Sequence, residues 1–404
     1  MGSPGGIMLP GVFVVYASPR VQTNEHVWQG GVSMRTKWWL WSLLWVLVMA
    51  VSACGGESTP TAEPTVQEEA GGETQTNEPR VVRLLTHDSF SVSEEVLAAF
   101  EAEHNATIEF VKGGDAGTTL NQAILSKENP LADVIFGVDN TFFSRAIDAD
   151  ITEPYTPAGL EHVPDDLKLD PQNRLVPIDW GDVCLNIDKA YFAENNLPKP
   201  QTLRDLTKPE YKGLTVVENP ATSSPGLAFM LATIGAFGTE GEYTWEDFWR
   251  EMRANDVLVT DGWEDAYYGQ FSGGSGEGTR PIVVSYATSP VAEVYFADPQ
   301  PEEPPTEAII ADNTCFRQIE FAGLLKNAAN PELGKALLDF MLSPTFQEDI
   351  PLQMFVFPAR PDVELPEVFV KHGKVAEKPA VVPPEAIEQH REEWIERWTE
   401  IVLR

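Results

Sequence analysis

Cysteine and histidine are scarce in this sequence, and their positions give no metal-binding pattern. The 404 residues include three cysteines and six scattered histidines, and no Cys-x-x-Cys pair occurs. The HExxH motif of zinc peptidases and the GxSxG motif of serine hydrolases are absent as well. Metal sites and catalytic sites of these classes need such clustered side chains. We therefore expect no metal centre and no cofactor, and a hydrolase is the weaker class of function.

Positive charge is also in short supply. Lys and Arg number 28 against 62 Asp and Glu, which gives a formal net charge of −34 at pH 7. Proteins that bind nucleic acid need Lys and Arg against the phosphates, so we expect no nucleic-acid partner. A negative field concentrates cations and therefore agrees with a cationic ligand. The same charge is equally consistent with a solubility bias that has no bearing on a ligand.

Only one long apolar run is present, and it is short for a membrane span. Arg35 and Lys37 precede sixteen mostly apolar residues, 38–53, which end in Val-Ser-Ala before Cys54. A span needs ~20 apolar residues, whereas this layout is typical of an export signal. Because the closing cysteine resembles a lipobox, we expect lipidation at Cys54 and an extracytoplasmic protein, in the periplasm or at the outer face, anchored to the cell membrane. An uncleaved signal anchor is the alternative.

The N-terminal part of the chain divides into three segments on this basis. Residues 1–33 are a doubtful extension, since an export signal can begin at Met34. Residues 34–53 are the lipoprotein signal peptide. Residues 54–80 are rich in Glu, Thr, Pro and Gly and contain almost no large aliphatic side chain. Such a segment buries too little apolar surface to fold, so we expect a disordered acidic tether.

Apolar patterning of the α/β type begins at residue 81. We expect strands at 81–85, 107–111 and 132–137, and helices at 94–104 and 118–126. This alternation indicates a parallel, doubly wound sheet. Residues 175–187 form an extended stretch that is long enough to pass from one lobe to another.

A second α/β set follows the extended stretch. Its expected elements are strands at 214–217 and 281–286 and helices at 225–237 and 244–254, with further helices at 331–342 and 384–404. Ser223 or Ser224 can cap the helix that Pro225 opens. Two α/β units in an exported protein are typical of solute receptors with a ligand cleft between hinged lobes. We assign residues 81–180 and about 314–365 to lobe I, about 181–313 to lobe II, and 366–404 to a C-terminal segment packed on both.

Polar or aromatic loops follow most of the expected strands. Open α/β sheets bind ligands at the carboxyl ends of their strands. The segments concerned are 86–90, 113–117, 137–140, 179–182, 221–224, 260–264 and 286–289. The ligand cleft is therefore expected where these loops meet.

The amino-acid sequences of these loops resemble those of one known family. THDSF, GVDN, PIDWG, NPATSSPGL, TDGWEDAY, VSYATSP and FMLSPTFQEDIP are similar, in order and spacing, to segments of the thiamine-binding periplasmic proteins. The resemblance runs from about residue 81 to residue 404. These proteins are solute receptors of thiamine ABC importers and have a type II periplasmic-binding-protein fold. The resemblance implies a monomeric receptor that captures thiamine or its phosphates and delivers the ligand to a membrane permease.

The family's ligand contacts fall on definite positions of this chain. They are Asp115, Ala116, Ser223, Ser224, Trp263, Tyr286, Ala287, Thr288 and Ser289. The chain departs from the family at three places: His87 replaces a tyrosine, Ala116 replaces a glycine, and a C-terminal aromatic is replaced around Met354 or Phe355. The sequence does not decide between thiamine, its monophosphate and its diphosphate.

The chemistry of these residues suits thiamine, which has a cationic thiazolium ring. Trp263 and Tyr286 offer aromatic faces to a cation, at ~0.5–2 kcal/mol each. The helix that opens at Ser223 and Ser224 offers N–H groups to a hydroxyl or phosphate tail. Weaker candidates for ligand contacts are His87, Asp88, Asp139, Asp179 and Trp180. Taken singly, Trp263 is as well explained by packing, and the serines by capping.

Three other functions remain open. Tyr267 and Tyr268 resemble the adjacent tyrosines of ferric-ion receptors, and a polyamine is another cationic ligand. A thiamine-degrading enzyme would need a nucleophilic cysteine, for which Cys184 is the one candidate. Cys184 and Cys315 both lie in strand-like sequence, and either a disulfide or two buried thiols agrees with it.

Overall fold

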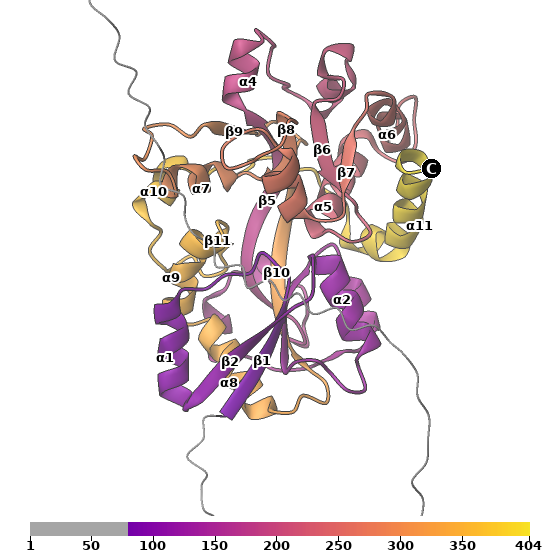
Figure 1. Cartoon of the computed structure of the whole chain (residues 1–404). Helices are drawn as coiled ribbons and strands as arrows, with labels where there is room; N and C mark the ends of the chain where they lie inside the picture. The colour runs from indigo at the N-terminus through magenta and orange to yellow at the C-terminus, as the bar shows by residue number, and fades with distance from the viewer. Residues whose placement is uncertain (1–79) are drawn as a thin grey trace, which may run out of the picture. The chain divides into compact units, whose positions relative to one another are not determined.

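The computed structural model describes residues 80–404 (Figure 1). The expected extension, signal peptide, Cys54 and tether lie outside the described residues. Within residues 80–404, no helix combines the length and the apolar character that crossing a membrane requires.

The first group of elements is a parallel α/β unit. Its strands are β1 (Arg80–Thr86), β2 (Ala106–Lys112) and β3 (Val134–Asp139), and its helices are α1 (Glu94–His104), α2 (Ala116–Leu125) and α3 (Phe143–Asp148). β1 pairs in parallel with both β2 and β3. Ser93 caps α1 and Asp115 caps α2, each through a side-chain oxygen that accepts a backbone N–H. The expected strands and helices of this unit are therefore present.

Two long strands run through the centre of the sheet. They are β5 (Val176–Asp188) and β10 (Phe316–Leu325), which pair with each other antiparallel. β10 also pairs with β3, and the second part of β5 pairs with β8. Figure 1 shows them between the β1, β2, α1 and α2 end of the molecule and the α4, α6, β6 and β7 end. They join the two groups of elements.

The second group of elements lies between β5 and β10 in the sequence. Its strands are β6 (Thr215–Glu218), β7 (Leu258–Thr260), β8 (Ile282–Tyr286) and β9 (Thr306–Ile309), and its helices are α4 (Lys189–Glu194), α5 (Ser224–Phe237), α6 (Trp245–Ala254), the π-helical turn η5 (Asp265–Gln270) and α7 (Ser289–Tyr295). β6 is parallel to β7 and β8. The first eleven residues of α5, from Ser224 to Ile234, are all buried, so α5 is the central helix of this group.

The parallel pairing expected from the strand-helix alternation at 81–137 is present, but it does not extend through the middle of the sheet. Along its main path the described sheet has the strand order β2-β1-β3-β10-β5-β8-β6-β7, with parallel pairs at both ends and antiparallel pairs in the middle. β5 and β10 are extended stretches that enter the sheet without the crossover helix that a parallel connection needs. The fold is a mixed-sheet α/β fold.

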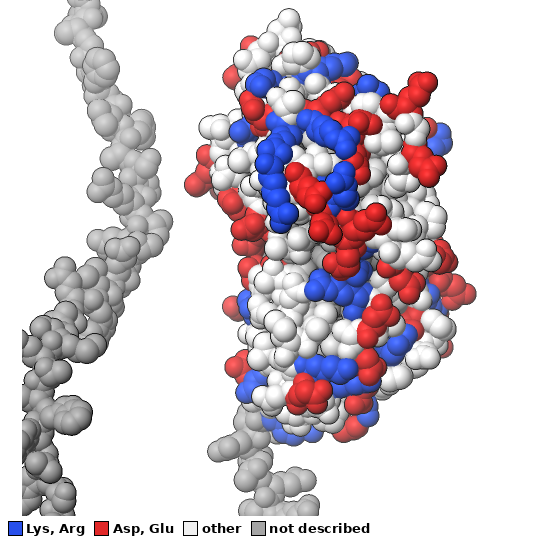
Figure 2. All heavy atoms as spheres, turned by 90° about the vertical axis from the view of Figure 1, so that its right-hand side faces the viewer, with Lys and Arg blue, Asp and Glu red and all other residues white. Residues whose placement is uncertain are grey.

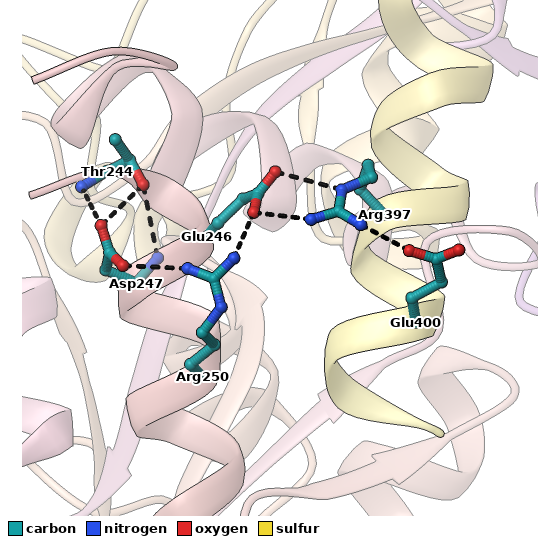
Figure 3. A network of polar contacts seen from close by, with 6 residues as sticks. All are labelled: Thr244, Glu246, Asp247, Arg250, Arg397 and Glu400. Atoms are coloured by element: carbon teal, nitrogen blue, oxygen red, sulfur yellow. Dashed lines mark hydrogen bonds and ion pairs between the residues drawn. The ribbon is translucent and has the colours of Figure 1, made fainter.

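The C-terminal region packs against both groups. It comprises α8 (Pro331–Met341), α9 (Pro344–Gln353), β11 (Phe357–Pro358), α10 (Glu367–His372) and α11 (Pro384–Val402), while a short β4 (Thr152–Glu153) pairs with β10. Trp398 of α11 is buried edge-on against Trp249 of α6. Arg397 of α11 binds Glu246 of α6 at 2.9 Å (Figure 3). Arg391 of α11 donates to the carbonyl of Thr141, next to α3.

Cationic side chains are interspersed with acidic ones on the face formed by α6 and α11 (Figure 2). Arg250 pairs with Glu246 and Asp247, and Arg397 pairs with Glu246 and Glu400 (Figure 3). Arg250 and Arg397 are thus each paired with two carboxylates.

Cys184 and Cys315 form a disulfide, which decides between the two states that the sequence left open. Both residues are fully buried and pack with Ala287 and Ala376. The bond joins β5 to the residue before β10.

Candidate functional site

A large cavity lies between the two groups of elements. Its volume is about 1010 Å³. It is lined by the loops after β1 and β2, the start of α5, residues 261–268 around η5, the end of β8, α7, the middle of β10 and residues 353–356. Five of the seven expected loops therefore meet at this cavity, whereas the segments 137–140 and 179–182 do not line it.

Asp115 links the two groups across the cavity wall. Its carboxylate accepts N–H bonds from Ala116 at 2.7 Å, Trp263 at 2.9 Å and Ser224 at 3.2 Å. Burial raises the pKa of Asp115, and the three N–H donors oppose that rise because they favour the ionised form. Gly262 allows this approach, since a Cβ there would lie 3.1 Å from Asp115 Oδ2.

Aromatic rings form one side of the cavity. Trp263 is stacked on Tyr267, with ring centroids 5.1 Å apart, and its indole N–H donates to Ser285 Oγ at 2.9 Å. Tyr267 covers one face of the indole, and both rings line the cavity. Tyr286 lines it too, and its hydroxyl donates to Gln318 at 3.2 Å. These contacts fix the orientation of the rings before any ligand binds.

His87 and Glu320 line the cavity, and a second carboxylate, Asp179, lies behind Glu320. His87 Nε2 is 3.2 Å from Glu320 Oε1, although the ring N–H lacks the alignment of a regular hydrogen bond. Asp179 lies opposite Glu320 in the β5–β10 register, and neither of its carboxyl oxygens has a hydrogen-bond partner among the described residues. Gly137, with φ of 94°, leaves room for His87, because a Cβ would lie 2.4 Å from its ring.

The pKa values of these groups reflect burial next to charge. Burial is the largest single effect on His87 and lowers its pKa, but the neighbouring carboxylates of Glu320 and Asp115 together outweigh it, so the net shift is upward from 6.5. Burial raises the pKa of Asp179 well above its usual value, and the charge of Glu320 adds to the rise. Burial also raises the pKa of Asp139 to about 6, against the effect of its hydrogen bonds with Ser224 and Thr141.

Eight of the residues singled out from the sequence line the cavity. They are Asp115, Ala116, Ser224, Trp263, Tyr286 and Ser289, together with the weaker candidates His87 and Asp88. Met354 and Phe355, where the family aromatic is replaced, line it as well.

The other six candidates lie behind the cavity wall. Ser223 is fully buried and caps α5 by accepting from Gly226 N–H, and Thr288 donates to the carbonyl of Phe355. Ala287 packs beside the disulfide. The carboxylate of Asp139 binds Thr141 and Ser224, whereas Trp180 stacks on Phe357 beneath the guanidinium of Arg317. Asp179, the sixth, is buried under Glu320.

Sequence reasoning missed several lining residues. Gln318 and Glu320 are on β10, which carries no loop motif, and Glu293 is on α7, beyond the loop expected at 286–289. Glu293 Oε1 accepts from Tyr267 at 2.8 Å and from Ser275 at 2.9 Å. The sequence contained one signal for these acids: each stands in a largely apolar strand or helix, at a position where an apolar residue is expected.

The charged side chains that line the cavity include many carboxylates. They include the carboxylates Asp88, Asp115, Asp261, Glu264, Asp265, Glu293 and Glu320. Among the described residues that line the cavity there is neither Lys nor Arg. Aromatic faces and carboxylates together suit a flat cation.

The family model of the bacterial extracellular solute-binding proteins matches residues 129–378. The chain belongs to this family. Its members are binding proteins, and membership places the protein outside the cytoplasm.

Two relatives are similar over most of their length. The thiamine-binding periplasmic protein of Salmonella typhimurium is 30% identical over 332 residues, which cover 80% of this chain and 94% of the relative. Its Escherichia coli counterpart is 29% identical over 329 residues, with 80% and 94% covered.

Solved structures show the same fold. A periplasmic thiamin binding protein superimposes with a TM-score of 0.69 at 27% identity, over 81% of this chain and 97% of that protein. A ferric binding protein from Campylobacter jejuni gives a TM-score of 0.62 at 17% identity, over 79% and 99%, which supports the fold alone. The type II periplasmic-binding-protein fold expected from the sequence is confirmed.

The residues that suggested a thiamine-degrading enzyme and a ferric-ion receptor are engaged in other contacts. Cys184 is held in the disulfide and does not line the cavity, so it offers no thiolate for a thiamine-degrading reaction. Tyr267 donates to Glu293, and burial followed by the charge of Glu293 raises its pKa well above 10. In the described part of the chain, no three His, Cys, Asp or Glu side chains are grouped to hold a metal ion.

Proposed function

We propose that this solute-binding protein captures thiamine outside the cytoplasm and delivers it to an ABC importer. The observation that carries the proposal is the cavity, which combines the aromatic faces of Trp263 and Tyr286 with a wall of carboxylates and, among the described residues, no Lys or Arg. The relatives from Salmonella typhimurium and Escherichia coli are both named thiamine-binding periplasmic protein.

The roles of the side chains follow from their positions. Trp263 and Tyr286 contact the thiazolium and pyrimidine rings, and Tyr267 supports Trp263 from behind. Glu320 and Asp115 supply negative charge to the cation and accept from the amino group. Ser224 and Ser289 line the same cavity and add polar contacts. A receptor that scavenges a vitamin needs a Kd in the micromolar range or below, roughly −8 kcal/mol.

Capture takes place by closure of two lobes. Lobe I comprises residues 81–180 and about 314–365, lobe II about 181–313, and residues 366–404 pack on both. β5 and β10 are the two connections through the sheet, so rotation about them would open the cavity. The contacts of Asp115 with Trp263 and Ser224 hold the lobes together across the cavity.

We further propose that Cys54 is lipidated and that residues 54–80 tether the receptor to the membrane. The sequence of the segment before Cys54 supports this, as set out above. The tether keeps the receptor near its permease, and the protein works as a monomer.

A polyamine is the second candidate ligand, because the same carboxylates suit it. The test is to denature protein purified from its native host and identify the released small molecules by mass spectrometry. Release of intact thiamine supports the proposal. Release of spermidine or putrescine without thiamine refutes it, and recovery of cleaved pyrimidine would point to an enzyme.

A further inference from the structure

We propose that Asp179 is a protonated positioning residue, whose O–H donates to Glu320 and keeps that carboxylate ionised and directed at the cavity. The inference rests on the proposed function and deepens it, because Glu320 is an acid assigned there to the cationic ligand. Asp179 itself does not line the cavity, so it acts through Glu320.

Three buried carboxyl groups stand side by side across the centre of the sheet. In the strand register, Glu320 of β10 lies opposite Asp139 of β3 on one side and opposite Asp179 of β5 on the other. Directly opposite residues of an antiparallel pair have Cβ atoms about 4.5–5.5 Å apart, and like charges at that spacing repel. The exposed fractions are 0% for Asp139, 5% for Glu320 and 1% for Asp179. Water therefore screens little of the repulsion, and each group that is ionised needs hydrogen-bond donors of its own.

Hydrogen-bond donors reach these three groups unequally. Asp139 accepts from two backbone N–H groups and two hydroxyl groups, which belong to Thr141, Phe142 and Ser224. Glu320 Oε1 has the His87 ring at 3.2 Å. Within residues 80–404, no donor reaches either oxygen of Asp179. Asp179 is therefore the group of the three that gains most from holding a proton.

A water molecule does not take the place of a donor to Asp179. The void beside Asp179 has a mainly apolar wall and leaves no space for the centre of a water molecule. Two other polar residues line this void, and each is already engaged: Ser91 Oγ donates to Gln353 at 3.3 Å, and Asp349 Oδ2 accepts from Ser93 N–H at 2.8 Å. The polar neighbour that remains is Glu320, and two carboxyl groups form a hydrogen bond only when one of them carries a proton.

The surrounding charges place this proton on Asp179 and not on Glu320. Burial, and after it the charge of Glu320, raises the pKa of Asp179 well above its usual value. Glu320 faces His87, whose imidazolium favours an ionised partner. The other titratable groups around the pair carry no positive charge in either protonation state; they are Asp139, Asp349 and Tyr286. Asp179 thus stays neutral, while Glu320 carries the negative charge that a cationic ligand meets.

Infrared spectroscopy tests the protonation of Asp179 directly, without any ligand. A protonated carboxylic acid has a C=O stretching band that an ionised carboxylate lacks. At neutral pH we expect the wild type to show more of this band than the Asp179→Asn variant. The control is Glu332→Gln, which removes a charge at an exposed site of α8 and should leave the band unchanged. A difference spectrum between the wild type and Asp179→Asn that lacks the band overturns the inference, whether or not the protein binds thiamine.

Two substitutions test the effect of Asp179 on binding, by calorimetric titration with thiamine. Asp179→Asn is neutral and keeps a donor for Glu320, so its Kd should stay within about fivefold of the wild type, with the same pH dependence. Asp179→Val is of comparable size but has no donor. Its Kd should rise by more than about fivefold, because a hydrogen bond to a charged group contributes more than that factor.

Each result decides the role of Asp179. A larger rise than this in Asp179→Asn, in protein with normal thermal melting, would show that Asp179 acts as a charge and would overturn the inference. A smaller rise in Asp179→Val would overturn it too, since Glu320 would not depend on the donor. If Asp179→Val does not fold, Asp179→Asn and the infrared difference decide. If thiamine does not bind to the wild type, the proposed function fails, and the infrared difference still decides whether Asp179 holds the proton.

Discussion

Trp263 shows how one side chain can be prepared for a ligand by its neighbours. Tyr267 stacks on it and Ser285 holds its indole N–H, so the ring is fixed at the cavity wall. We predict that Trp263→Leu, which keeps apolar bulk but removes the indole, weakens thiamine binding by roughly tenfold or more, the size of one cation–π contact. Calorimetry measures the effect.

The control for this change is Tyr191→Leu. Tyr191 is a half-buried ring of α4 that does not line the cavity, so its replacement should leave the Kd within twofold. Equal losses in the two variants would show that ring removal acts through the fold and not through the ligand.

His87 makes affinity depend on pH. Its pKa is shifted upward because Glu320, and to a smaller extent Asp115, outweigh burial and Lys112. The imidazolium thus stabilises the folded protein fully below pH ~6.5, and this contribution is lost as pH rises through the folded-state pKa. A cationic ligand competes with the imidazolium for Glu320, so the Kd for thiamine should fall as pH rises through the same window.

His87→Gln should flatten both pH profiles in that window. Binding and thermal melting between pH 5.5 and 8.5 measure them. His162→Gln, which alters an imidazole outside the cavity lining, is the control. A wild-type pH profile in the His87 variant would refute this role.

A cavity-lining residue could be predicted from the sequence only where it lies in a loop after an expected strand or at the start of an expected helix. Asp115, Ser224 and Trp263 could be placed because they follow strands or open helices and match the family motifs. Glu320 could not, because only the register of β10 against β3 and β5 turns its side chain toward His87. Register is set by pairing between distant segments, and periodicity within one segment does not reveal it.

At the scale of elements, α11 tests how far the C-terminal helix supports the fold. Trp398 is fully buried and packs edge-on against Trp249 of α6, with ring centroids 5.4 Å apart. Trp398→Ala should lower the free energy of unfolding by about 3–5 kcal/mol, through lost burial and a cavity. Urea denaturation measures the change.

Glu396→Ala is the control on the same helix. Its side chain is exposed, so the variant should remain within about 0.5 kcal/mol of the wild type. A Trp398 variant as stable as this control would mean that α11 contributes little to the folded core.

Long amphipathic elements were predictable, and short or unusual ones were not. The helix expected at 94–104 coincides with α1, because Ser93 caps it and apolar residues recur at helical spacing. α9 was not expected, since Pro351 lies inside it and proline normally marks a helix end. α7 was not expected, because its first residue, Ser289, was interpreted as the end of the ligand loop at 286–289.

At the scale of the whole molecule, a disulfide links β5 to the residue that precedes β10. The disulfide joins residues 131 positions apart. Replacing both cysteines by alanine should cost about 2–5 kcal/mol of unfolding free energy, because the unfolded chain gains freedom. The thiamine Kd of the folded variant should stay the same, since neither cysteine lines the cavity. Intact stability, or a loss of affinity in fully folded protein, would contradict this account.

The overall architecture was predictable in its two α/β groups but not in its central strands. The βαβ rhythm at 81–137 correctly gave parallel pairs. The direction of β5 and β10 could not be obtained in this way, because a fully buried extended run reads the same in a parallel and an antiparallel sheet. The cavity exists because these two strands carry the chain between the groups.

The central claim is that the cavity binds thiamine. Its most direct test is calorimetric titration of the purified protein with thiamine and, in separate titrations, with spermidine and with ferric ion. The account predicts saturable heat for thiamine with a Kd in the micromolar range or tighter, and no saturable heat for the other two. No heat with thiamine, together with saturable binding of spermidine or iron, would contradict it.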